Sequence, residues 1–337
     1  MKKIVGLTLV LMLIFSLASF AEGKKESGAP ESITLVGGVM LPQGHVYYQA
    51  MEKFVELLDE YYTGPIELKY ELHHSGSIGT EKDMFEFMMQ GVSVDFAIIS
   101  PAWVATWDKT APIIDAPFLF KSIEHWEKSL EAGALDSIAE TIRKKGVRFI
   151  GYGGGGARSL ILNQPVKTLD DFGKIDLRVQ GSPLHAAVFG AIGLNPTPLD
   201  YTECYNAIKT GVIDGLENEP AGLEGMKFYE VAPYYALSEH QITTRILCFS
   251  ESRLQSFPQD LQDAIVKAGL EAGRWHRKTE VAMGQQIIDK LAANHGLKTI
   301  DFTKAQKDEM ARRAMPEVMK YAKEVGATEI VEKIQNL

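Results

Sequence analysis

The stretch that decides the fold runs from Lys174 to Pro220 and reads KIDLRVQGSPLHAAVFGAIGLNPTPLDYTECYNAIKTGVIDGLENEP. Its first residues alternate apolar and polar side chains, which predicts a short strand that ends near Arg178. A helix should follow, because Ser182 is a good N-cap and Pro183 suits the first helical turn. An extended link, a second short helix and another strand-like run complete the stretch.

This order of elements is typical of an open α/β sheet, in which ligands bind beyond the carboxyl ends of the strands. Arg178 lies at such an end, just before a helix N-terminus that offers unpaired N–H groups. A guanidinium is a planar fork of donors that stays charged, so it suits a carboxylate. Position alone favours the ordinary alternative of an exposed or ion-paired arginine, since most arginines are exposed.

The same stretch resembles the central signature of the DctP-type substrate-binding proteins of tripartite ATP-independent periplasmic (TRAP) transporters. That signature runs approximately as L-R-V, a helix, G-x-x-P-T-P, an aromatic residue and E-x-Y-x-A-L-x-T-G-x-x-D-G-x-E-N, and the order of elements elsewhere also agrees. The resemblance implies an α/β, two-domain periplasmic binding protein. Its hinged lobes would each be a mixed sheet flanked by helices, with a long C-terminal strut helix and no cofactor.

On this basis we expect lobe I to comprise residues 32–154 and 244–283. Lobe II would comprise residues 155–243 and 284–337, including the C-terminal helices. The glycines at 153–156 would form the hinge, because GxxxxGK[ST] is absent and a strand rather than a helix follows them.

Further elements are expected outside the central stretch. A strand, helix, strand, helix, strand order fills the first part of the chain, and a helical region follows over 123–145. The residues from Pro258 to about Asn294 predict one long helix that stops at Gly296.

Residues 1–21 have the pattern of a secretory signal peptide, since Lys2 and Lys3 precede an apolar run that closes on small residues. The run is marginally short for a bilayer crossing, which needs roughly 20 residues, so cleavage is favoured over an anchor. Residues 22–31 are polar and predict a flexible N-terminus. We therefore expect a periplasmic protein that does not insert directly into the membrane after cleavage.

Composition narrows the classes of partner. The 337 residues are 45% hydrophobic, which is enough for two globular cores. The formal net charge is −9, and removing the leader with its two lysines makes it −11. Such an acidic body disfavours nucleic acid and anionic membrane surfaces as partners, so an anionic ligand needs a local basic site.

The resemblance implies seven ligand-binding residues: Arg178, Arg158, Asn218, Tyr201, Glu81, Ser100 and Trp103. Arg178 would hold the carboxylate, with Arg158 and Asn218 completing that contact. Judged by itself, Glu81 is an ordinary first-turn glutamate that favours the helix dipole. Trp103 could stack on a sugar ring or fill the core. The remaining residues would contact the body of the ligand.

Other chemistries have weaker support. The histidines do not show H-x3-H or HExxH spacing, and no G-x-S-x-G is present. Glu217 and Glu219 could serve acid/base work, although the simpler interpretation places one on each face of a strand with Asn218 between them. Cys204 and Cys248 are expected to be separate buried thiols.

The expected function is a non-enzymatic extracytoplasmic receptor that binds a small organic acid and delivers it to membrane permease subunits. One alternative is an exported enzyme acting on sugar acids, with Glu217 and Glu81 as acid and base. Another is a receptor that passes its ligand to a sensor kinase. The sequence leaves sugar acids, C4-dicarboxylates, keto acids and aromatic acids open as ligands.

Overall fold

The computed structural model describes residues 31–337. The signal peptide predicted over 1–21 therefore lies outside the described residues, as does nearly all of the flexible segment predicted over 22–31. Within residues 31–337, no helix is both long enough and apolar enough to cross a bilayer.

The described residues divide into two compact units. The first retains only residues 31–33 and 65–67, and the second comprises residues 34–64 and 68–337. All features of the site described below belong to the second unit.

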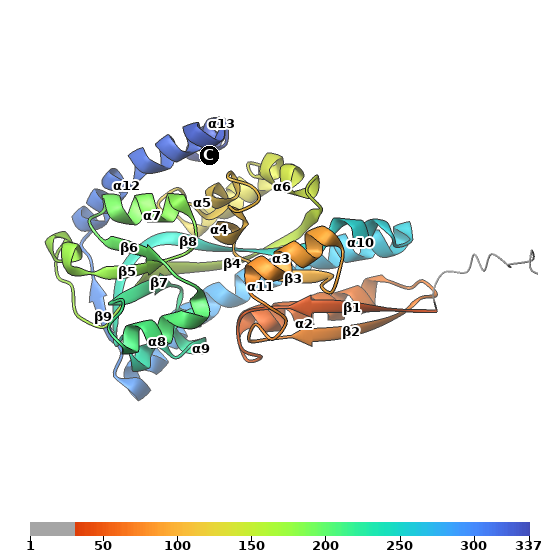
Figure 1. The fold of residues 1–337 in the computed structure, drawn as a ribbon, viewed down its shortest axis with the longest axis horizontal. Coiled ribbons are helices and arrows are strands. Elements are labelled where there is room, and N and C mark those ends of the chain that lie inside the picture. Colours follow the sequence, from red (N-terminus) through yellow and green to blue (C-terminus); the bar gives the residue numbers. More distant parts are fainter. Residues whose placement is uncertain (1–30) are drawn as a thin grey trace, which may run out of the picture. The chain divides into compact units, whose positions relative to one another are not determined.

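Helices and strands alternate along most of the chain (Figure 1). The strands are β1 (Ser32–Gly38), β2 (Glu67–His73), β3 (Phe96–Ile99), β4 (Val147–Leu162), β5 (Asp176–Val179), β6 (Asn195–Pro198), β7 (Gly215–Asn218), β8 (Tyr234–Ser250) and β9 (Lys298–Asp301). The helices of the first half are α2 (Val46–Tyr61), α3 (Glu81–Gln90), α4 (Pro101–Val104), η1 (Ala111–Asp115), α5 (Ile123–Glu131), α6 (Asp136–Arg143) and η2 (Leu169–Lys174). Those of the second half are α7 (Pro183–Ala191), η3 (Tyr201–Glu203), α8 (Cys204–Lys209), α9 (Pro220–Gly225), η4 (Phe228–Glu230), α10 (Glu251–Gln255), α11 (Gln259–His295), α12 (Lys304–Val325) and α13 (Thr328–Gln335).

The strands form one mixed sheet in the order β2-β1-β3-β8-β4-β7-β5-β6, with β9 beside β8. Two long antiparallel strands, β4 and β8, lie at the centre of this order. The shorter strands β2, β1 and β3 lie on the β8 side, and β7, β5 and β6 lie on the β4 side. Val147 of β4 lies opposite Ser250 of β8 at one end of this pair, and Leu162 lies opposite Tyr234 at the other. The predicted α/β class with a mixed sheet and flanking helices is confirmed. The β4–β8 pair connects the shorter strands on its two sides into one sheet.

The glycine run lies inside β4, where the register against β8 shifts between Gly154 and Ala157. Gly154 and Gly155 have φ of +98° and +104°, a region that other residues rarely adopt. A side chain on Gly154 would also place its Cβ 2.2 Å from the carbonyl oxygen of Thr243. The glycines predicted to form the hinge therefore make a bulge in one continuous strand.

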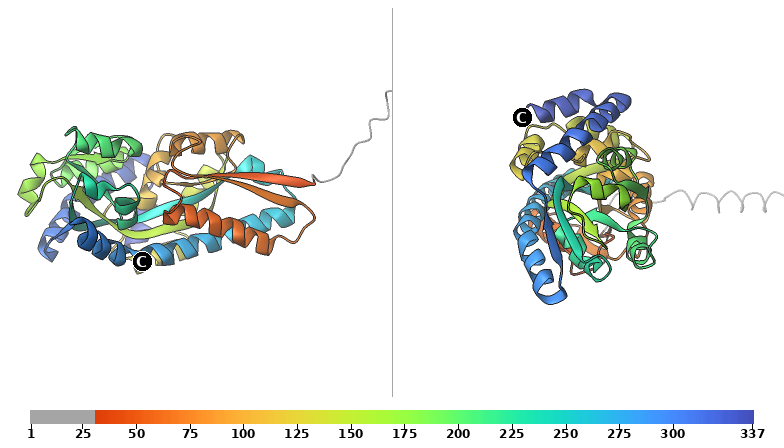
Figure 2. Two further views of the ribbon diagram at one scale, coloured as in Figure 1. Left: turned by 90° about the horizontal axis from the view of Figure 1, so that it is seen from below. Right: turned by 90° about the vertical axis from the view of Figure 1, so that its left-hand side faces the viewer.

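The predicted long helix is confirmed as α11, which starts after Pro258 and ends at Gly296 with φ of +69°. It packs against β4 and α2, and Figure 2 shows α2 running alongside it. The helical region expected over 123–145 is divided into α5 and α6. Gly133 adopts φ of +61° between them, which interrupts the helical backbone.

Local sequence explains how two helices near the site begin. Thr80 and Asp83 form a capping box, which starts α3 at Glu81. Pro183 occupies the first position of α7 as predicted, although the side chain of Ser182 makes no capping hydrogen bond. The capping box thus fixes the position of Glu81 at the helix start.

Candidate ligand-binding site

All seven residues predicted to bind the ligand line one cavity of about 30 Å³. They reach it from six separate parts of the chain: β4, β5, β7, η3, α3 and the segment formed by the end of β3 with α4. Five further residues complete the lining: Leu41, Tyr47, Gln180, Glu219 and Arg245. The fold therefore brings together side chains that are far apart in the sequence.

Arg178 lies near the end of β5, between the parallel strands β6 and β7. Only 1% of its surface is exposed. Its Nε donates to the carbonyl oxygen of Leu199 at 2.8 Å, and its guanidinium lies 5.4 Å from the centre of the Tyr201 ring. Nη1 and Nη2 have no hydrogen-bond partner among the described residues. Four of its five N–H donors are thus available to a ligand.

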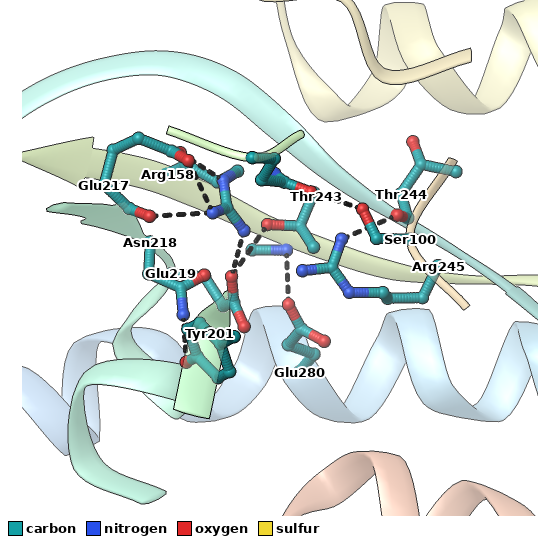
Figure 3. A network of polar contacts seen from close by, with 12 residues as sticks. Ser100, Arg158, Tyr201, Glu217, Asn218, Glu219, Thr243, Thr244, Arg245 and Glu280 are labelled. Atoms are coloured by element: carbon teal, nitrogen blue, oxygen red, sulfur yellow. Dashed lines mark hydrogen bonds and ion pairs between the residues drawn. The ribbon is translucent and has the colours of Figure 1, made fainter. Parts of the chain in front are cut away.

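Arg158 on β4 is equally buried but bonded differently (Figure 3). Its Nη1 donates to Glu219 Oε2 at 2.6 Å, and its Nε and Nη2 donate to the side chain and carbonyl of Glu217. These four hydrogen bonds leave one of its five donors for a ligand. The expectation of one carboxylate on each strand face was wrong, because residues two apart share a face and both meet Arg158.

The pairing controls the protonation of both glutamates. Burial by itself raises the pKa of the Glu217 carboxyl, but the charge of Arg158 and the hydrogen bonds from His240 and Arg158 outweigh it and hold that pKa well below its usual range. The pKa of Glu219 is also lowered, since Arg158 and Arg245 together outweigh the effect of burial. A carboxylate held ionised in this way is a poor general acid at neutral pH, which counts against Glu217 as the acid of an enzyme.

Asn218 ends β7 and points its amide toward Tyr201. Its Nδ2 donates to the Tyr201 hydroxyl at 2.6 Å, while its Oδ1 has no partner within residues 31–337. Gly222 on α9 allows this approach, because a Cβ there would lie 2.1 Å from Asn218 Nδ2. The site therefore offers an unpaired acceptor as well as the donors of Arg178.

Glu81 and Ser100 lie next to each other in the cavity lining. Ser100 N donates to Glu81 Oε2 at 2.9 Å, and Ser100 Oγ donates to Gln180 Oε1. Burial raises the pKa of Glu81, although Arg245, the Ser100 backbone and Arg178 oppose that effect. Nε2 of Gln180 is a further buried donor for which the described part of the chain provides no acceptor.

Trp103 covers one side of the cavity rather than filling the core. A Cβ on Gly181 would lie 2.2 Å from its ring, so the indole rests directly on this glycine backbone. Lys82 Nζ lies over the same ring, 4.9 Å from its centre. Trp103 thus forms part of the cavity wall, where α4 meets the backbone just before α7.

The sequence did not predict Arg245 as part of the site. It lies on β8, is 7% exposed, and donates from Nη1 to the Thr244 carbonyl at 2.9 Å. Its guanidinium lies 5.3 Å from the centre of the Tyr47 ring, and its Nε has no partner in residues 31–337. The available signal was an arginine inside the apolar strand pattern TTRILCFS.

Two other buried features lie outside the predicted set. Asp115 is fully buried, neither of its carboxyl oxygens has a partner among the residues described, and burial raises its pKa to about 7. Cys204 and Cys248 are both buried and unpaired with each other, as expected. The described residues contain no group of three or more His, Cys, Asp or Glu side chains arranged to hold a metal ion.

Comparison with known families gives a consistent result. A family model described as bacterial extracellular solute-binding protein, family 7 (DctP), matches residues 37–324. A solute-binding protein from Sulfitobacter sp. strain NAS-14.1 is 36% identical over 308 residues. The alignment covers 91% of this chain and 92% of that protein.

Solved structures agree with the sequence comparison. A TRAP periplasmic solute-binding protein from Sulfitobacter sp. NAS-14.1, with bound α-D-taluronate, has a TM-score of 0.86 and 36% identity, covering 90% of this chain and 97% of that one. A TRAP periplasmic solute-binding protein from Chromohalobacter salexigens DSM 3043, with bound D-glucuronate, has a TM-score of 0.82 and 28% identity. That match covers 90% of this chain and 99% of the other.

Proposed function

The chain belongs to the DctP family of bacterial extracellular solute-binding proteins, and on that premise we propose that it is a receptor for a sugar acid. The family is one of solute receptors, and the resemblance read from Lys174–Pro220 is confirmed by the family match. The uronates bound in the two related structures support a hydroxylated carboxylate as the ligand.

The observation that carries this proposal is the bonding of Arg178. A fully buried guanidinium with four available donors is costly unless a partner completes its hydrogen bonds. A carboxylate can accept from Nη1 and Nη2 in a bidentate pair, which is the strongest contact that these groups make. Asn218 Oδ1 then accepts from a hydroxyl of the same ligand, and the last donor of Arg158 completes the carboxylate contact.

We propose that entry requires an opening motion. The cavity of about 30 Å³ has room for only about two or three waters, since one water needs roughly 10–15 Å³. A six-carbon acid therefore enters when Trp103 and the facing wall move apart. We propose that the two lobes have the boundaries predicted from the sequence, residues 32–154 with 244–283 and residues 155–243 with 284–337. The glycine bulge of β4 is the proposed hinge between them.

In this proposal the protein is exported, its leader is cleaved, and the ligand-bound form delivers the acid to the permease subunits of a TRAP transporter. The ligand leaves chemically unchanged. Electrostatic recognition is local, because the three cavity arginines act within a chain whose formal net charge is −11 once the leader and its two lysines are removed.

A thermal-shift screen tests the proposal. The full chain is unfolded and refolded to remove co-purified ligand, and then mixed with D-glucuronate, D-galacturonate, D-galactonate, succinate and pyruvate. A sugar acid at a hundred times its dissociation constant should stabilise the fold by about 2.7 kcal/mol. Mass spectrometry of the released acid should show an unaltered molecule. Absence of any shift, or a shift with a chemically changed acid, would contradict the proposal.

A further inference from the structure

The two ends of the glycine bulge in β4 are packed differently. A Cβ on Gly153 would lie 2.1 Å from Nδ1 of His276, so the imidazole rests directly on this glycine. Gly155 and Gly156 line a cavity of about 330 Å³ that residues of α11 also line. The first end of the bulge is therefore enclosed by a ring, whereas the second end borders open space.

Glu280 of α11 contacts the second end of the bulge (Figure 3). The register of β4 against β8 passes from Gly154 to Ala157 and gives Gly156 no paired residue on β8. Gly156 N donates instead to Glu280 Oε1 at 3.1 Å. Glu280 is only 2% exposed, and its Oε2 lies 3.0 Å from Nε2 of His276, one helical turn earlier. One carboxyl group thus joins the ring at the first end of the bulge to the backbone at the second.

The second end of the bulge lies next to the ligand cavity. Arg158 follows Gly156 by two residues on the same strand, and a Cβ on Gly156 would lie 3.1 Å from Cβ of Glu219. Arg158 and Glu219 both line the cavity and share a hydrogen bond of 2.6 Å. A shift of the Gly156 backbone would therefore displace two residues of the cavity lining.

The proposed lobe boundaries divide the contacts of the bulge. Gly153 and His276 both belong to lobe I, so their contact stays intact when the lobes separate. Glu280 also belongs to lobe I, but Gly156 belongs to lobe II. Opening therefore separates the two partners of this hydrogen bond, and the bond is specific to the closed form.

We propose that Glu280 is a positioning residue of the ligand site: it holds the Gly156 backbone in the arrangement that closes the cavity, and so slows release of the bound acid. The inference rests on the proposed function and extends it to a residue that does not line the ligand cavity. Without Glu280, the Gly156 N–H is buried in the closed form with no acceptor, which favours the open form.

Binding kinetics test this role. Stopped-flow tryptophan fluorescence of the refolded full chain follows association and release of D-glucuronate, D-galacturonate and D-galactonate, with Trp103 of the cavity lining as a reporter. Glu280→Ala should release the acid about tenfold faster, because an unsatisfied buried donor destabilises the closed form. Association should stay within about threefold of the wild type, since the ligand enters the open form. Glu280→Gln keeps an oxygen acceptor for Gly156 N, so its release should stay within about threefold of the wild type.

Gly156→Ala tests the same contact from its other partner. Its Cβ would lie 2.7 Å from Glu280 Oε1 and should displace that carboxyl group, so release should again be faster. Gly173→Ala is the matched control, because a Cβ there meets no atom beyond its chain neighbours within 4 Å. Glu271→Ala is the control for Glu280, since Glu271 lies on the same helix and accepts from Tyr61 instead of the bulge. Both controls should keep release within about twofold of the wild type.

Amide hydrogen exchange gives a readout without ligand. Measured by mass spectrometry, residues 153–158 of Glu280→Ala should exchange faster than in the wild type, because Gly156 N has lost its acceptor. The same residues of Glu280→Gln should exchange at close to the wild-type rate.

The outcomes are distinguishable. Release within about twofold of the wild type in Glu280→Ala, or in Gly156→Ala if the first variant does not fold, would overturn the inference and leave the proposed function intact. Unchanged exchange of residues 153–158 in Glu280→Ala would also overturn it, as would a loss of stability without faster release, which indicates a purely structural role. Failure of every sugar acid to bind the wild-type chain would overturn the proposed function and this inference with it.

Discussion

Arg158 and Arg178 are equally buried, each with 1% of its surface exposed, yet their partners differ almost completely. Arg158 uses four of its donors on Glu217 and Glu219, whereas Arg178 uses one on a backbone carbonyl. Burial alone therefore does not indicate the role of a charged residue. The count of unsatisfied donors separates a cation whose hydrogen bonds the fold itself satisfies from one whose donors lack partners among the described residues, as the proposed ligand contact of Arg178 requires.

This difference predicts opposite effects on stability when each arginine is removed. Removing one member of a buried ion pair leaves its partner charged and unsolvated, which is strongly destabilising. Removing a buried cation that lacks a counter-ion also removes its desolvation cost. The two arginines should thus respond differently to the same substitution.

The largest effect is expected for Arg158→Ala. The substitution leaves Glu217 and Glu219 buried without their cation, so the free energy of unfolding should fall by about 3–5 kcal/mol. Urea unfolding followed by circular dichroism at pH 7, without ligand, measures this change. Arg312→Ala is the control, and its effect should stay within about 0.5 kcal/mol, as for most surface changes. A comparable small loss in Arg158→Ala would mean that the ion pairs do not support the fold.

Arg178→Ala should affect binding rather than stability. Loss of the Leu199 hydrogen bond is offset by removal of an uncompensated buried charge, so the free energy of unfolding should change by about 1 kcal/mol or less. Binding of the sugar acid that gives the largest thermal shift should weaken by about 2–5 kcal/mol, measured by calorimetry. Lysine should restore only part of this, because it lacks the planar fork. If the alanine variant bound the acid with wild-type affinity, Arg178 would not be a ligand-binding residue.

Local signals explain what the sequence could predict. The capping residues of α3, the glycine that ends α11 and the strand that ends near Arg178 depend on neighbours within one or two turns of chain. The motif around Arg178 and Asn218 is likewise continuous in sequence. These features were therefore accessible before the structure was known.

The remaining features depend on strand register. Ser159 lies opposite Asn218 across β4 and β7, which places Arg158 on the same face as Glu217 and Glu219. Arg245 enters the cavity only because β8 pairs with β4 along its whole length. No local pattern reports such long-range pairing, so the partners of Arg158 and the presence of Arg245 in the cavity lining could not be predicted from the sequence.

Asp115 extends the comparison to carboxyl groups, since it is as buried as Glu217 but has no hydrogen-bond partner within the described chain. Burial raises its pKa from 3.8 to about 7, so between these values the folded state binds a proton that the unfolded state does not. Its contribution to stability is therefore full below pH 3.8 and is lost as the pH rises through about 7. The contribution of Glu217 to stability changes with pH in the opposite direction. Because its pKa is lowered in the folded state, that contribution is present above pH 4.5 and is lost as the pH falls below it.

The smallest effect, and the finest test, comes from Asp115→Asn. The unfolding free energy of wild type minus that of the variant should decrease as the pH rises from 4 to 7, by at most about 1.4 kcal/mol per pH unit. The difference between the two curves is the useful quantity, because His45 and His185, whose pKa values burial lowers to about 4, titrate with the opposite sign in both proteins. Urea unfolding at half-unit pH steps measures both curves. A difference that does not change with pH would mean that Asp115 is ionised in the folded state. An unpaired buried carboxyl would then behave like the paired Glu217, and the number of hydrogen-bond partners would not distinguish neutral from ionised buried carboxyl groups.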